Sequence, residues 1–139
     1  MTNSGLPTGK KEQRTSIKMK TSSQLESLLG ISLPEDYKEF IDSTGYLCLG
    51  NISTEVYGYK PDFDIEKLPC VIAATKLNKE DYNLQEHEIV VSHTGFEDYI
   101  VVLDTVSGVV FEVNLSGKKK IIAKSFSDWL ANLISREQN

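Results

Sequence analysis

The spacing of apolar residues first predicts a short helix in the N-terminal third of the chain. Tyr37, Phe40 and Ile41 recur at positions i, i+3 and i+4, so one face of this helix is apolar. Pro34 suits the first helical position, because its fixed φ is already helical and its missing N–H needs no partner there. Gly45 can adopt the left-handed conformation that commonly follows a helix end.

Two further helices are indicated by N-capping patterns. Ser23 with Glu26 forms a capping box, and the helix that it starts is expected to end at Gly30. Ser125 with Asp128 repeats the pattern near the C-terminus. We expect this last helix to dock on a sheet with Trp129 as a core anchor, through an apolar stripe formed by Phe126, Trp129, Leu130, Leu133 and Ile134.

Short apolar runs separated by closely spaced turn residues predict antiparallel strands. The run over 98–104 is the strongest, and its apolar residues occupy both faces, which favours a central strand that is covered on both sides. The full set of expected strands is 46–50, 55–59, 88–92, 98–104, 109–113 and 118–123.

The segment 65–83 is compatible with two structures. Residues 68–74 alone could form a buried strand. A helix is favoured, because Pro69 suits a helix start and apolar residues then recur at helical spacing, namely Cys70, Ala73, Ala74 and Leu77.

This order of elements predicts an α+β fold with a mostly antiparallel, twisted sheet flanked by short helices. The 139 residues suit a single domain that buries a core without metal or disulfides. Residues 1–20 have almost no apolar side chains and are expected to form a flexible basic tail before a domain over 21–139.

Charge divides the chain. The net charge is −5, yet the tail is basic, so the rest is distinctly acidic, and residues 80–117 contain no Lys or Arg. Such a surface repels nucleic acid and attracts cationic partners. We find neither a secretory h-region nor a membrane-length apolar run, and therefore expect a cytoplasmic protein with no membrane partner.

Residues that could carry chemistry are few. Cys48 and Cys70 are expected to be buried, reduced thiols. His87 and His93 flank an expected strand, which places them about 20 Å apart, too far for one metal site. No phosphate loop or nucleophile motif is present, and we expect no catalytic residue, no cofactor and no metal ligand. Acidic residues around the two histidines leave an enzyme or small-ligand protein as an alternative.

The stretch over residues 29–41, which contains Pro34, Tyr37 and Phe40, resembles the opening motif of the SUKH superfamily. This superfamily includes bacterial immunity proteins of polymorphic toxin systems and yeast cell-wall-synthesis regulators. The resemblance covers most of the chain, with further likeness over 71–82, 102–105 and 121–130. In this family these positions are core and turn residues. The most specific part is formed by Leu29, Gly30, Leu33, Pro34, Tyr37 and Phe40.

The resemblance implies an immunity protein that binds and neutralises a cognate toxin domain, often a basic nuclease. A regulatory or scaffold module of the same fold is the alternative. We expect a monomer, with a dimer left open. Tyrosines beside carboxylates make plausible interface anchors. The expected partner-binding residues are Glu55, Tyr57, Tyr59, Asp62, Phe63, Asp64, Glu97 and Asp98.

Overall fold

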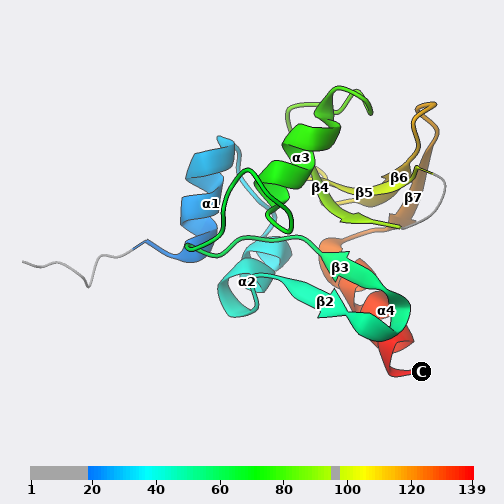
Figure 1. Cartoon of the computed structure of the whole chain (residues 1–139), viewed down its shortest axis with the longest axis horizontal. Coiled ribbons are helices and arrows are strands. Elements are labelled where there is room, and N and C mark those ends of the chain that lie inside the picture. Colours follow the sequence, from blue (N-terminus) through cyan, green and yellow to red (C-terminus); the bar gives the residue numbers. More distant parts are fainter. Residues whose placement is uncertain (1–18, 95–97) are drawn as a thin grey trace, which may run out of the picture.

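The computed structural model describes residues 19–94 and 98–139 and has the expected α+β architecture. In Figure 1, α1 and α2 lie on one side, the four-stranded sheet lies on the other, and the β2–β3 hairpin lies beside α4. The elements are α1 (Thr21–Leu29), α2 (Glu35–Ser43), β2 (Leu47–Leu49), the 3-10 helix η3 (Gly50–Ile52), β3 (Thr54–Val56), α3 (Val71–Lys79), β4 (Glu88–His93), β5 (Ile100–Asp104), β6 (Val110–Val113), β7 (Lys119–Ala123) and α4 (Phe126–Gln138).

The strands are divided between two antiparallel sheets. One contains β2 and β3, and the other has the order β4-β5-β6-β7. The prediction of a central strand is confirmed, because β5 pairs with both β4 and β6. Its residues Ile100, Val101, Val102 and Leu103 are all buried, so both faces of this strand are covered.

The two predicted N-terminal helices are confirmed as α1 and α2, which we call the helical hairpin, but the predicted N-cap of α1 is wrong. Gly30 ends α1 and Gly45 follows α2, both with left-handed φ. α1 begins with Lys20 as its N-cap, and no side chain caps it, so the Ser23–Glu26 capping box is wrong. The Glu26 carboxylate instead accepts a hydrogen bond from the backbone N–H of Leu33, at 2.8 Å, and so joins the helix to the following turn.

The segment 71–79 is a helix, as favoured by its apolar spacing, and Cys70, Ala73 and Ala74 are buried as predicted, but Leu77 is not. Leu77 is 64% exposed, whereas the first turn, beginning with Val71 and Ile72, is buried. The first turn is embedded because the backbone N–H of Val71 bonds the Gly58 carbonyl. Further along, the Thr75 hydroxyl accepts a bond from the N–H of Val90 in β4, and the last turn then projects from the core.

The C-terminal helix is capped and packed largely as predicted. The Ser125 hydroxyl accepts the backbone N–H of Asp128 at 3.1 Å. Phe126 and Trp129 are buried, whereas Ile134 lies at the exposed end of the stripe. The aromatic ring of Phe126 meets Tyr37 of α2 with centroids 4.8 Å apart, so α4 closes the core against the helical hairpin as well as against β7.

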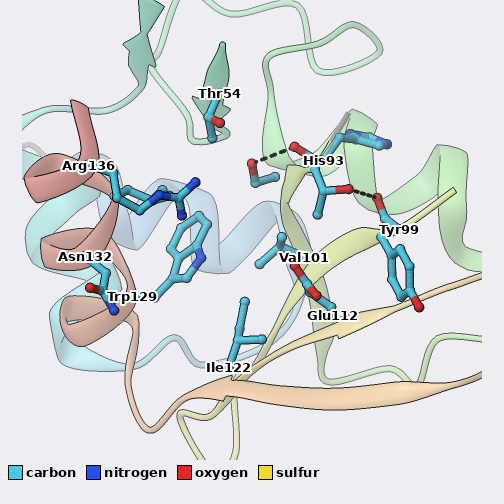
Figure 2. Close-up of a pocket in the computed structure, with 12 residues that line it drawn as sticks. Thr54, His93, Tyr99, Val101, Glu112, Ile122, Trp129, Asn132 and Arg136 are labelled. Carbon is cyan, nitrogen blue, oxygen red and sulfur yellow. Dashed lines mark hydrogen bonds between the residues drawn. The ribbon is translucent and has the colours of Figure 1, made fainter. Parts of the chain in front are cut away.

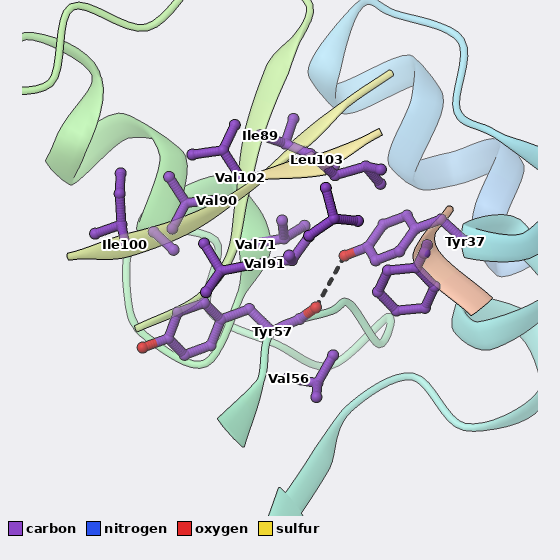
Figure 3. Packing of buried hydrophobic residues seen from close by; sticks show 14 of the residues in the cluster. Tyr37, Val56, Tyr57, Val71, Ile89, Val90, Val91, Ile100, Val102 and Leu103 are labelled. Carbon is purple, nitrogen blue, oxygen red and sulfur yellow. Dashed lines mark hydrogen bonds between the residues drawn. The ribbon is translucent and has the colours of Figure 1, made fainter. Parts of the chain in front are cut away.

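A backbone strap over 57–59 connects the two sheets and the helical hairpin. The Tyr57 N–H donates to Val91 of β4, and the Tyr59 N–H donates to Gly45. Figure 3 shows the Tyr37 hydroxyl donating to the Tyr57 carbonyl, at 2.9 Å. Gly58 is required at the crossing, because a Cβ there would lie 1.6 Å from the Gly45 oxygen.

Among the described residues, no helix is long and apolar enough to cross a membrane. Of the predicted basic tail, residues 1–18 lie outside the part that the structure describes.

Candidate functional site

Two of the predicted partner-binding residues, Glu55 and Phe63, come together through Tyr46, which was not predicted. The Tyr46 hydroxyl donates to a Glu55 carboxylate oxygen at 2.7 Å, and the Tyr46 ring meets Phe63 with centroids 6.3 Å apart. Partial burial, together with the bond to Glu55, raises the pKa of Tyr46, so its hydroxyl stays protonated. Asp62 and Asp64 flank Phe63. We call Tyr46, Glu55, Asp62, Phe63 and Asp64 the hairpin face.

The carboxylates of the hairpin face are exposed, and no described Lys, Arg or His forms an ion pair with them. Glu55, Asp62 and Asp64 are all exposed, and within the described residues none forms an ion pair. Lys60 lies in the same loop and likewise makes no ion pair with a residue in the described part of the chain. Phe63 is half-buried and packs against the core, which holds the loop in place. The face therefore combines fixed aromatic rings with unpaired negative charge.

Tyr57 and Tyr59 do not belong to this face. They are only 5% and 6% exposed and lie in the hydrophobic core. The strap over 57–59 is covered on both sides, so alternate side chains are not free to face solvent. Tyr57 instead places its hydroxyl 2.7 Å from Nδ1 of His93, and burial, followed by the charge of Glu55, raises the pKa of Tyr57 to about 12.

The remaining two predicted residues are Glu97 and Asp98, which lie between β4 and β5 in the sequence. Glu97 lies outside the described residues. Asp98 is exposed and has φ of 63°, and its carbonyl accepts a 2.6 Å bond from the Tyr82 hydroxyl. No hydrogen bond, ion pair or ring contact in the described part of the chain joins Asp98 to the hairpin face.

The acidic run over 80–117 is partly neutralised by lysines from outside it. Lys79 bonds Glu86 at 2.8 Å, and Lys119 lies 3.5 Å from buried Glu88. A stretch without basic residues in the sequence is therefore not a continuous acidic surface in the fold.

A cavity of about 400 Å³ opens between α4 and the four-stranded sheet. Figure 2 shows Trp129 and Arg136 on one side and His93 on the other, with Glu112 between them. Neither Glu112 nor Arg136 uses its charge in an ion pair with any described residue. The cavity is lined by Thr54, Ser92, His93, Thr94, Tyr99, Val101, Glu112, Ile122, Trp129, Asn132, Leu133 and Arg136.

Sequence reasoning missed this cavity because its lining comes from several separate elements. The available signal was local to α4, where Asn132 and Arg136 follow Trp129 at helical spacing. Burial lowers the pKa of His93, so its imidazole is neutral at pH 7. With His93 neutral, the charged groups that line the cavity are the Glu112 carboxylate and the Arg136 guanidinium. These two groups suit binding of a polar side chain or a small ligand.

Over residues 19–94 and 98–139, the other reactive side chains form no nucleophile–base pair. Cys70 is buried as expected, but Cys48 is exposed, because the three-residue strand β2 turns its side chain outward; both are free thiols. Within the described residues, neither imidazole bonds a serine or cysteine side chain, and the Ser92 hydroxyl donates to the backbone carbonyl of His93 at 3.4 Å. His87 lies apart from His93, with its Nε2 3.6 Å from a carboxylate oxygen of Asp104.

The fold and these surfaces define a small α+β domain built on a helical hairpin and an antiparallel meander. A family model described as SMI1-KNR4 cell-wall matches residues 7–135, and the chain belongs to this family, within the SUKH superfamily. No curated protein sequence matches the chain. Membership is consistent with an immunity or a regulatory role.

Proposed function

We propose that this protein is an immunity protein that binds and neutralises a cognate toxin domain of nuclease type. The observation that carries the proposal is membership of the SUKH superfamily, combined with the unpaired carboxylates of the hairpin face. Nucleases carry positive charge because they bind phosphate, so a carboxylate-rich surface can occupy the same basic groove. Charge complementarity of this kind also accelerates encounter.

The hairpin face has the composition of a contact surface. Tyr46 and Phe63 supply aromatic area, and the packing of Phe63 against the core lowers the entropy cost of ordering the loop on binding. Glu55, Asp62 and Asp64 supply charge around these rings. Neutralisation by docking requires no chemical step from the protein itself.

Co-expression tests the assignment. The probe is the C-terminal domain encoded by the gene immediately upstream, produced with and without this protein. We expect that domain to stop growth alone, and expect the protein to restore growth and to co-purify with it. A harmless neighbouring domain, or a toxic one that the protein fails to neutralise, contradicts the immunity assignment.

Charge reversal tests the proposed surface. Glu55→Lys with Asp62→Lys should lower the association rate constant with that domain by about tenfold at low ionic strength, because long-range attraction is reversed. The difference should shrink in high salt, where charges are screened. Stopped-flow fluorescence at two salt concentrations measures both values.

A matched control has the same change in net charge elsewhere. Glu80→Lys with Asp81→Lys alters two exposed carboxylates after α3 and should change the rate far less. Equal slowing by both pairs would mean that only net charge matters and would remove the hairpin face from the interface. The same measurement on Glu97→Lys with Asp98→Lys decides whether the β4–β5 turn takes part.

The alternative is a regulatory or scaffold module of the same fold. The family description, which refers to the cell wall, favours this second function. It would use the same type of exposed surface to bind a cellular protein. Either a harmless neighbouring domain or a toxic one that the protein fails to neutralise would favour this alternative.

A further inference from the structure

We propose that His87, Glu88 and Asp104 form a binding site for a divalent transition-metal ion, with Zn²⁺ as the natural probe. One imidazole nitrogen and two carboxylate oxygens from these residues all lie within 4.8 Å of one another. Imidazole with carboxylate is a donor set that Zn²⁺ accepts. The inference is independent of the immunity function, because none of these three residues belongs to the hairpin face.

Strand pairing positions the three donors. Glu88 and Asp104 are direct cross-strand partners in the β4–β5 ladder, so their side chains lie on the same face of the sheet. His87 immediately precedes Glu88, and its carbonyl accepts bonds from both the N–H and the hydroxyl of Thr105, at 3.0 and 2.6 Å. The two strand ends are therefore held together before any ion arrives.

The His87–Asp104 pair already has a spacing close to that of two metal ligands. Donors of a tetrahedral Zn²⁺ site lie roughly 3.3–3.6 Å apart, and Nε2 of His87 is 3.6 Å from Oδ2 of Asp104. The other oxygen, Oδ1, accepts the backbone N–H groups of Val106 and Ser107, which orients the carboxylate and leaves Oδ2 available. Both side chains are partly exposed, so water can complete the coordination.

Lys119 occupies the position where a cation would sit beside Glu88. The Glu88 side chain is only 5% exposed, and a buried carboxylate needs a positive partner. One carboxylate oxygen accepts the N–H of Gln85, whereas the other has only a long 3.5 Å contact with the Lys119 ammonium. Because the Lys119 side chain is 55% exposed, its ammonium can move into solvent when a divalent ion binds.

Calorimetric titration of the full chain with ZnCl₂ tests the site. We expect one ion per chain, and expect His87→Gln and Asp104→Asn each to weaken binding by about tenfold or more. Lys119→Met should instead tighten binding by about tenfold, because it removes a competing positive charge. A gain in affinity cannot arise from a variant that folds poorly.

Two controls address other Zn²⁺ ligands in the chain. His93→Gln alters the second histidine, and Cys48→Ser removes the exposed thiol; neither should change the affinity. With Co²⁺ as the probe, visible absorption bands that are lost in His87→Gln report direct ligation. Absence of stoichiometric binding, or binding that Cys48→Ser abolishes and His87→Gln does not, overturns the proposal.

Discussion

At the scale of single residues, a hydroxyl deep in the core decides how the strap is held. Tyr37 is fully buried, and burial raises its pKa well above the usual value for a tyrosine. Its ring packs on Phe126, while its hydroxyl donates to the Tyr57 carbonyl. A phenylalanine would satisfy the apolar spacing that predicts α2, but it would leave that carbonyl without this partner.

Tyr37→Phe is therefore expected to lower the free energy of unfolding by about 1–3 kcal/mol, because a buried carbonyl loses its hydrogen bond. Urea unfolding followed by circular dichroism measures the change. Tyr82→Phe is the matched control, since its hydroxyl donates to Asp98 at an exposed turn, where water can replace it. We expect a loss within roughly 0.5 kcal/mol for that variant. Similar losses for both variants would show that the buried bond contributes little.

At the scale of elements, two serines with similar local sequences have different roles. Ser125 caps α4, whereas Ser23 lies inside the first turn of α1, which begins at Thr21. The start of α1 is displaced because Ser22 donates through both its N–H and its hydroxyl to Asp42 of α2, at 2.8 Å each. This contact between helices overrides the local capping signal.

Ser125→Ala should destabilise the protein by about 1 kcal/mol, because the N–H of Asp128 loses its side-chain acceptor. Ser23→Ala should cost little or even stabilise slightly, since alanine is a better helix former and no cap is lost. Midpoints of thermal unfolding for the two variants measure the difference. Equal destabilisation would restore Ser23 as the N-cap of α1.

At the scale of the whole molecule, one buried cluster includes residues of all four helices and of both sheets. The helical hairpin contributes Leu25 and Tyr37, the four-stranded sheet contributes Val102, and α4 contributes Phe126 and Trp129. Because no part has a separate core, the described domain should unfold as one cooperative unit.

Trp129 is the only tryptophan, so its fluorescence reports on α4 alone, whereas far-UV circular dichroism reports on all helices. We expect the two urea transitions to coincide. Phe126→Leu should lower both midpoints by the same amount, because its side chain touches α2 as well as Trp129. Two separate midpoints would mean that α4 dissociates before the remainder unfolds.

Much of the fold could be predicted from the sequence, since most elements depend on neighbours a few residues apart. The α2 face of Tyr37, Phe40 and Ile41, the meander over β4–β7 and the cap at Ser125 were all correct. The errors for Leu77 of α3 and Cys48 of β2 arose because burial of these side chains depends on cover from a distant segment, and both are exposed.

The sequence by itself determined the α+β class, the superfamily and the excess of negative charge. Only the tertiary structure decided that Tyr57 is core while Glu55 is surface, and that His87 lies beside Asp104. The physical reason is that periodicity follows from local backbone geometry, whereas burial and charge pairing depend on which remote segments pack together.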